Sequence, residues 1–232
     1  MNKKLIPLAA AALSALAFLS VPTGASAGEY EAHCEKEGVV QATCNATISG
    51  GFIELSDTSG LRWHCKTLVG SGAFTTTTST GTATLELNEC TDFVFGTECN
   101  NQGAGTKRIK TNALVSHFVN LEPAPGTTPG VLFTGFNLTF SCPAMGVKKT
   151  YTGSLIGHLE EPSTVCNKAV SSFKLNFEKT ANGQQLFKQV TTTGTIFDLI
   201  SSNDVGGAYL TQAITGTVAV SILEGRAIKI TC

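Results

Sequence analysis

The side chains best suited to acid–base chemistry near neutral pH are four histidines, which lie far apart in the sequence. They are His33, His64, His117 and His158. His117 lies in the apolar stretch 114–119, which is typical of a core or edge strand. A serine hydrolase of the α/β type would need a Gly-x-Ser-x-Gly turn, and the sequence contains none. Ser71, between two glycines, fits a turn between strands better. We therefore predict no catalytic residue.

Carboxylates and polar loops offer equally little for hydrolysis or for calcium binding. Glycosidases need two opposed carboxylates, but the adjacent Glu160 and Glu161 precede a proline and are typical of a solvated turn. Asp198 alternates with apolar residues, which predicts a charge on the outer face of a strand. The polar stretch 201–206 lacks the spacing and closing glutamate of an EF-hand, so we predict a plain loop. No cofactor is indicated.

Two His-Cys pairs, at 33–34 and 64–65, together hold the residue types of a zinc site. No Cys-x-x-Cys or His-x-x-x-His spacing accompanies them, and neighbours in a strand point to opposite faces. We therefore predict no metal site. Trp63 shares the face of Cys65, which favours a core residue over a sugar-stacking platform. Asn45 and Asn137 match the glycosylation pattern, which a threonine-rich chain contains by chance.

The first 27 residues have the organisation of a secretory signal peptide. A cationic start at 1–4 precedes an apolar run at 5–21, and Ala25-Ser26-Ala27 supplies the small residues of a cleavage site. The alternative is an uncleaved anchor, because an apolar run of about 17 residues is near the lower limit for spanning a membrane. The break at 22–24 favours cleavage after Ala27, which leaves a mature chain of 28–232 outside the cell.

Eight cysteines lie in this mature region, and an even number in an exported chain predicts four disulfides. They are Cys34, Cys44, Cys65, Cys90, Cys99, Cys142, Cys166 and Cys232. Sequence proximity favours Cys90 with Cys99, because the residues 92–96 between them look like the arm of a hairpin. The next expected pairs are Cys34 with Cys44 and Cys142 with Cys166, which leaves Cys65 for Cys232.

Composition excludes several classes of protein. Only 14% of residues are charged and 42% are hydrophobic, which argues against a coiled coil or a disordered chain. The formal net charge of -1 offers no basic field to hold nucleic acid by its phosphates. What remains is a neutral, glycine-rich globular chain.

Alternation of apolar and polar residues recurs along the mature chain and predicts half-buried strands. Such segments are 84–87, 136–140, 173–177, 217–222 and 227–230, and Asn182-Gly183 is a hairpin turn signal. We predict an all-β fold, an antiparallel sandwich or barrel stapled by disulfides. A single domain over 28–232 is favoured, with a split near 123–130 into two smaller β domains as the alternative.

Two weak repeats support this fold. A Thr-Gly motif begins at 80, 152, 193 and 215, which suggests recurring strand starts where glycine bends or bulges the chain. Three segments end in an apolar-x-apolar-x-Cys pattern, at Cys65, Cys142 and Cys232. The period of two predicts that these cysteines point inward, and that at least one bridges strands within the core.

Several short motifs are shared with a known group of proteins. They are Trp63–Cys65, Gly70–Thr76, Gly81–Leu85, Cys90–Thr91, Pro129–Leu132 and Phe140–Cys142. In these motifs the chain resembles uncharacterised exported, disulfide-containing all-β proteins of high-GC Gram-positive bacteria, from Trp63 to about residue 200. The resemblance implies export and a β fold but no particular activity. Cys34 and Cys44 lie outside it.

Three functions stay open at this point. The first is an exported, disulfide-stabilised binding or surface-structural module, favoured because the scaffold features come without a catalytic constellation. The second is a small-molecule carrier with a cavity inside a β-barrel. The third is a secreted hydrolase with an unrecognised site. An apolar cavity would favour the carrier, and a cleft that gathers histidines or carboxylates would favour the hydrolase.

Overall fold

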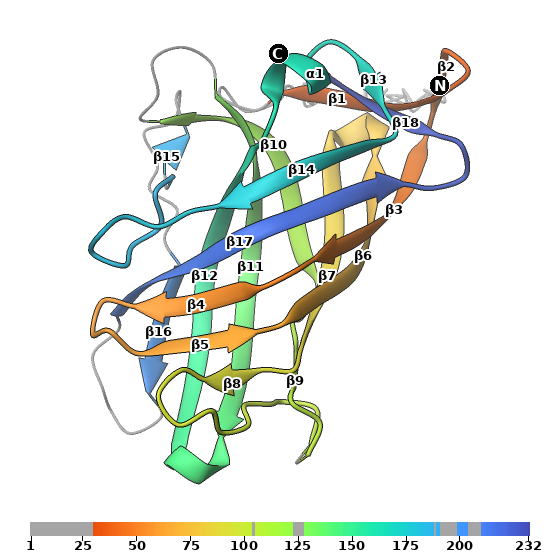
Figure 1. Ribbon diagram of the computed structural model, residues 1–232. Helices are drawn as coiled ribbons and strands as arrows, with labels where there is room; N and C mark the ends of the chain where they lie inside the picture. Colours follow the sequence, from red (N-terminus) through yellow and green to blue (C-terminus); the bar gives the residue numbers. More distant parts are fainter. Residues whose placement is uncertain (1–29, 104, 123–127, 188, 191–198, 204–209) are drawn as a thin grey trace, which may run out of the picture.

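The structure is a computed structural model that describes residues 30–103, 105–122, 128–187, 189–190, 199–203 and 210–232 (Figure 1). The side chains at 122, 189–190 and 199–203 are not included in this description. The expected signal peptide at 1–27, Asp198 and the 204–206 part of the predicted polar loop lie outside the described residues. The loop prediction is wrong for 201–203, which belong to the strand Leu199–Asn203.

The described chain is built almost entirely of antiparallel strands, so the all-β prediction is confirmed. The strands are β1 (Glu31–Lys36), β2 (Val39–Gln41), β3 (Thr43–Gly50), β4 (Ile53–Asp57), β5 (Arg62–Cys65), β6 (Thr67–Thr75), β7 (Thr80–Asn88), β8 (Thr91–Asp92), β9 (Arg108–Lys110), β10 (Leu114–Glu122), β11 (Pro129–Cys142), β12 (Val147–Leu159), β13 (Ala169–Val170), β14 (Ser172–Phe177), β15 (Gln189–Val190), β16 (Leu199–Asn203), β17 (Leu210–Ile222) and β18 (Ala227–Thr231). Three short helical turns complete it: η1 (Thr76–Thr78), η2 (Pro143–Met145) and α1 (Pro162–Val165). All five segments predicted from alternation lie within strands.

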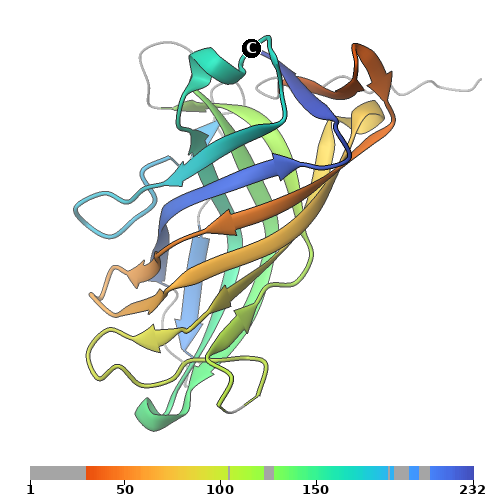
Figure 2. The ribbon, with the colours of Figure 1, turned by 45° about the vertical axis from the view of Figure 1, so that its right-hand side comes forward.

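Eight strands of the large sheet close into a ring (Figure 2). β14 pairs with β12 on one side and with β17 on the other, and β11, β10, β7, β6 and β3 complete the circuit. β17 is long enough for two sets of neighbours, because its first half pairs with β16 and β4 and its second half with β14 and β3. The result is a flattened barrel whose opposite walls pack against each other as the sheets of a sandwich do.

A second sheet of order β13-β18-β1-β2 lies at one end of the ring (Figure 1). Ile228 and Ile230 of β18 are buried, as are Ala32 and Cys34 of β1. This burial confirms the predicted inward face of β18. The second sheet thus covers the end of the core and holds the C-terminal strand between β1 and β13.

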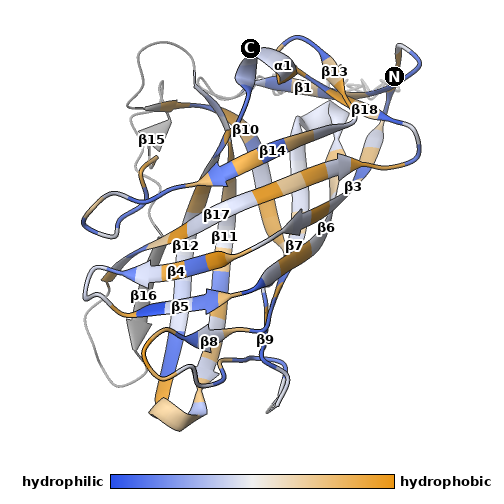
Figure 3. Ribbon diagram, viewed as in Figure 1, coloured by the Kyte–Doolittle hydropathy of each residue, from blue (hydrophilic) through white to orange (hydrophobic). Residues whose placement is uncertain are grey.

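Side chains fill the interior. Phe136, Leu138 and Phe140 of β11 are buried while the residues between them are not, which is the alternation seen as colour changes along the strands in Figure 3. Trp63 is 1% exposed and meets Phe140 edge-on, so its assignment to the core is confirmed. Two apolar voids among the described residues measure ≈ 30 and ≈ 60 Å³. Ligand pockets measure roughly 300–1,000 Å³, so these two voids are too small for a ligand and have the size of packing defects.

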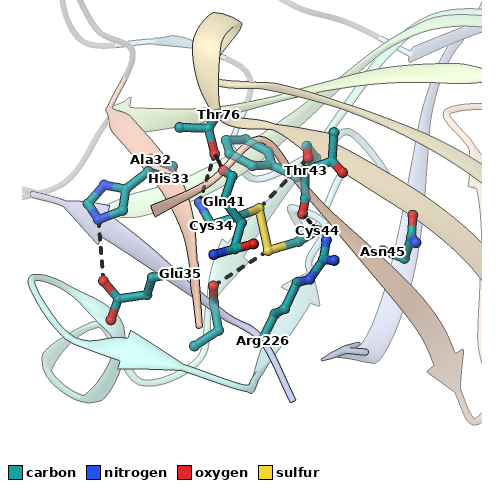
Figure 4. The surroundings of a disulfide bond; sticks show 12 residues. Ala32, His33, Cys34, Glu35, Gln41, Thr43, Cys44, Asn45, Thr76 and Arg226 are labelled. Atoms are coloured by element: carbon teal, nitrogen blue, oxygen red, sulfur yellow. Dashed lines mark hydrogen bonds and ion pairs between the residues drawn. A yellow bond between two sulfur atoms is a disulfide. The ribbon is translucent and has the colours of Figure 1, made fainter. Parts of the chain in front are cut away.

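All eight cysteines form disulfides, which confirms four bridges and leaves no free thiol. The pairs are Cys34–Cys44, Cys65–Cys90, Cys99–Cys142 and Cys166–Cys232. Only the expected Cys34–Cys44 bridge is confirmed. Thr76 supports it, since its hydroxyl accepts a hydrogen bond from the Cys34 amide and donates one to the Gln41 carbonyl (Figure 4).

The predicted Cys90–Cys99 bridge is wrong, although the hairpin arm behind it exists. The Cys99 amide donates to the Cys90 carbonyl at 3.0 Å, and Thr91 pairs with Glu98. The sulfurs nevertheless bond to neighbouring strands, Cys90 to Cys65 at the end of β5 and Cys99 to Cys142 at the end of β11. The expected Cys142–Cys166 and Cys65–Cys232 bridges are wrong for the same reason: strand neighbours decide the pairing.

The cysteines that end the three apolar-x-apolar-x-Cys segments were predicted to point inward, and this is correct for two of them. Cys65 and Cys142 are fully buried, and both bridge separate elements of the core. Cys232 is exposed and bonds to Cys166, so its assignment to the core is wrong. The last strand ends one residue earlier, at Thr231, and Cys232 therefore lies beyond the alternation that orients its neighbours.

Glycines mark bends within strands more often than strand starts. The Thr-Gly motif opens a strand at Gly81, but Gly153 and Gly216 lie inside β12 and β17 with φ of 111° and 143°. A Cβ on Gly216 would approach the Phe52 carbonyl oxygen to 2.7 Å, so only glycine fits there. The motif at 193 lies outside the described residues.

The proline-rich segment at 123–127 lies between two strands that are antiparallel neighbours, β10 and β11. That segment itself lies outside the described residues. The single-domain organisation over 28–232 stays a prediction, as does the alternative of two smaller domains.

Candidate functional site

An exposed apolar patch lies on the outer face of β4, β5 and β8. We call it the aromatic patch; it consists of Phe52, His64, Phe93, Val94 and Phe95. The side chains of Phe52, Phe93, Val94 and Phe95 are 56%, 49%, 65% and 71% exposed. Apolar side chains of this size rarely gather on the surface without a function.

Three rings of the aromatic patch, those of Phe52, His64 and Phe93, contact one another. His64 stacks on Phe52 with ring centres 5.6 Å apart, and it meets Phe93 edge-on at 6.1 Å. The hydroxyl oxygen of Thr91 lies 3.0 Å from Nε2 of His64, and this hydrogen bond sets the orientation of the imidazole. The guanidinium of Arg62 lies 4.0 Å from the centre of the Phe93 ring, a cation–π contact. The patch is therefore an ordered surface with a cation at its rim.

Period-two geometry explains why these side chains share one face. Glu54 pairs with His64 and Ser56 pairs with Arg62, so the outward positions of β4 and β5 lie side by side. His64 in turn pairs with Thr91 of β8. Leu55 and Trp63, one position along, point into the core.

Asp92 organises the loop that carries Phe93, Val94 and Phe95. One carboxylate oxygen accepts hydrogen bonds from the amides of Val94 (3.0 Å) and Phe95 (2.6 Å). The other accepts from the amide of Thr97 at 2.6 Å and from its hydroxyl. Burial raises the pKa of Asp92, but the hydrogen bonds from Thr97, Phe95 and Val94 outweigh burial and hold this pKa below its ordinary 3.8.

Replacing Asp92 with asparagine should therefore destabilise the fold by about 1–3 kcal/mol, because an amide nitrogen would face the Thr97 donors. The lowered pKa also fixes the sign of the pH dependence. Asp92 contributes stability above its unfolded pKa of about 3.9, and this contribution is lost as pH falls through the lower folded value.

Urea unfolding near neutral pH and in acid checks this prediction. The wild type should lose more stability than Asp92→Asn between the two conditions. Equal losses in both proteins would show that the loop does not depend on the Asp92 charge.

A polar hollow of ≈ 350 Å³ lies beside the aromatic patch. Arg62, Ser56 and Lys179 contribute to its lining. Nζ of Lys179 forms an ion pair with Oε1 of Glu54, and Oε2 of Glu54 lies 4.0 Å from Nη1 of Arg62. Ser56 is 3% exposed, and its hydroxyl has no hydrogen-bond partner among the described residues. The hollow thus offers a donor and acceptor next to an apolar surface.

The four histidines do not come together among the described residues, and the hollow of ≈ 300 Å³ that Glu160 and Glu161 line contains no histidine. His33 lies 3.5 Å from Glu35, and His158 lies 3.7 Å from Glu178. Glu160 pairs with Lys174 at 3.1 Å on the surface. No group of three or more metal-ligating side chains occurs in the part of the chain that the structure describes.

Sequence reasoning missed the aromatic patch because it treated 92–96 only as the arm of a disulfide hairpin. The available signal was an apolar Phe-Val-Phe run between an aspartate and a glycine, where a loop tip should be polar. Phe52 gave no comparable signal, since its role depends on the neighbouring strand.

No helix in the described part of the chain is long and apolar enough to cross a membrane. The four disulfides indicate an oxidising environment such as the extracellular space. Comparisons with protein-family models, curated proteins and solved structures found no match.

Proposed function

We propose that this chain is an exported binding module, matured by cleavage after Ala27, that holds a partner protein through the aromatic patch. The main support is that Phe93, Val94 and Phe95 are exposed on a loop whose backbone is held by hydrogen bonds to Asp92. A rigid apolar surface loses little conformational entropy on binding, so its burial converts efficiently into affinity.

The chemistry of the patch favours an apolar protein surface as the partner. Protein interfaces are enriched in aromatic residues and arginine at their centres, which matches Phe93 beneath Arg62. An anionic lipid surface would require a basic field, whereas the formal net charge is -1. The patch rings carry no hydroxyl and no indole nitrogen to orient a sugar. A partner carboxylate could enter the hollow and meet Arg62.

Two observations on the described residues favour this proposal over the two alternative functions. A carrier needs a cavity of ligand size, and the apolar voids of ≈ 30 and ≈ 60 Å³ are far smaller. A hydrolase needs a nucleophile or paired acid and base, and the described histidines lie apart in separate contacts.

The test is selection from a phage-displayed random peptide library on the immobilised mature chain. We expect enriched peptides that combine aromatic or aliphatic residues with an acidic one. The Phe93→Ser/Phe95→Ser variant should bind these peptides about 100-fold more weakly, because each lost aromatic anchor costs about 1.4 kcal/mol or more.

The matched control is Val39→Ser/Val40→Ser. These residues are 63% and 58% exposed on β2, so they test exposed apolar residues away from the patch. The control should bind as the wild type does. Equal peptide binding by the Phe93/Phe95 variant would refute the proposal. If no peptide is enriched and the patch instead binds phosphatidylcholine–phosphatidylglycerol vesicles or insoluble polysaccharide, the proposed protein partner is wrong. The partner would then be a membrane or a polysaccharide.

A further inference from the structure

A lysine and an aspartate meet with both side chains buried, beside the polar hollow that Asp57 helps to line. Nζ of Lys149 on β12 lies 3.3 Å from Oδ2 of Asp57 at the end of β4, and the two side chains are 1% and 0% exposed. β16 and β17 lie between these strands along the sheet, so the two side chains meet across the interior. The pair joins positions 92 residues apart.

One side of this pair is packed with aromatic rings. Nζ of Lys149 lies 5.3 Å from the centre of the Trp63 ring, and Tyr151 packs edge-on against the same indole. Phe140 stacks on Tyr151 with ring centres 5.5 Å apart. A buried ion pair in such a site recovers little of the desolvation cost of its two charges.

Hydrogen bonds fix the carboxyl group of Asp57 in an orientation that suits attack of a nucleophile on its Cγ. Oδ1 of Asp57 accepts hydrogen bonds from the Ser59 amide at 2.9 Å, the Ser59 hydroxyl at 2.5 Å and the Leu61 amide at 3.0 Å. Oδ2 faces only the lysine among the hydrogen bonds of the described residues. Three donors on one oxygen form the arrangement that stabilises a developing oxyanion.

Tyr151 supplies a neutral hydroxyl next to the pair. Burial, together with the charge of Asp57, raises the pKa of Tyr151 well above its ordinary value, so the hydroxyl keeps its proton. This hydroxyl is buried without a hydrogen-bond partner among the described residues. No hydrogen bond joins it to Lys149 or Asp57, so Tyr151 contributes a neutral, packed wall beside the pair.

We propose that Lys149 and Asp57 condense to an intramolecular isopeptide bond. Lys149 first transfers a proton to Oδ2 of Asp57, which leaves an amine facing a carboxylic acid. Nitrogen attacks Cγ, the C–N bond forms, and negative charge collects on Oδ1 beneath the Ser59 and Leu61 donors. A second proton then passes directly from nitrogen to Oδ2, the oxygen that Lys149 already faces at 3.3 Å.

The Cγ–Oδ2 bond then breaks and one water leaves. Ammonium and carboxylate have become one neutral amide and one water, so the step needs neither an oxidant nor a cofactor. The amide removes two charges whose side chains are 1% and 0% exposed, and burial of such charges is costly. The barrel wall at β12 is then covalently tied to β4.

The decisive experiment is the intact mass of the purified mature chain after reduction of its disulfides. We expect a mass one water below that of the sequence, and a branched peptide after digestion that joins residues 57 and 149. Lys149→Arg keeps the positive charge but cannot form the amide, so it should show the full mass. Asp57→Ala should also show the full mass.

Lys148→Arg is the matched control, because Lys148 is the exposed neighbour on the same strand; it should keep the mass loss. A wild-type chain at full mass overturns the proposal whether or not any variant folds. A mass loss that persists in Lys149→Arg overturns it as well, since it would mark cyclisation at an aspartate instead of a cross-link.

Discussion

A chain that lacks residues 227–232 should fail to accumulate in folded form outside the cell. The deletion removes β18, whose Ile228 and Ile230 are 2% and 0% exposed. Burial of two isoleucines stabilises the fold by about 3–6 kcal/mol. The deletion also removes the partner of Cys166 in a bridge across 66 residues, which adds about 4 kcal/mol. Together these losses approach the whole stability of a typical domain, about 5–15 kcal/mol.

Secreted yield, circular dichroism and thermal unfolding of the truncated chain check this expectation. Cys166→Ala/Cys232→Ala is the control, because it removes the bridge and leaves β18 in place between β1 and β13. This control should fold and lose only the contribution of the disulfide. A truncated chain with the melting temperature of the wild type would show that β18 does not belong to the core.

Removal of the Cys99–Cys142 bridge should destabilise the fold by about 4 kcal/mol, because this bridge closes a 43-residue separation and limits the unfolded chain. Both sulfurs are buried, and the bridge lies next to the paired backbones of Asn100 and Ser141, with N–O distances of 2.8 and 2.9 Å. These contacts join the hairpin arm that carries the aromatic patch to β11. Loss of the bridge should therefore weaken peptide binding at the patch as well.

The comparison is Cys99→Ala/Cys142→Ala against Cys34→Ala/Cys44→Ala in urea unfolding. The second pair spans only 10 residues and should cost about 3 kcal/mol, with peptide binding unchanged. An equal loss of stability in the two variants, with binding intact in both, would contradict the role given to the Cys99–Cys142 bridge.

The alternation of residues such as Phe136, Leu138 and Phe140 was sufficient to predict strands, their inner faces and the all-β class. That success has a local cause, since a period of two can bury only one face of a strand. The even number of cysteines predicted four bridges in the same way. The Asn182-Gly183 turn is also local: the Gly183 amide donates to the Thr180 carbonyl, and Lys179 pairs with Gln185.

The partners of these strands were decided only by the tertiary structure. Cys90 bonds to Cys65 because β8 lies beside β5, and nothing in the spacing of the cysteines reports that adjacency. Proximity along the chain measures the entropy of closing a loop, which grows only slowly with length and is easily outweighed by strand pairing.

The candidate site follows the same division. The Phe-Val-Phe run at 93–95 can be seen in the sequence, but the stacking of Phe52 on His64 and the cation over Phe93 require β4, β5 and β8 side by side. Lys149 and Asp57 are likewise two ordinary charges until β16 and β17 bring β12 and β4 together. By itself the sequence determined the strands and their buried faces, because these depend on neighbours along the chain, and it determined the number of bridges through the even count of cysteines. The tertiary structure decided the disulfide pairs, the aromatic patch and the buried Lys149–Asp57 contact, because each joins residues on strands that only the closed sheet brings together.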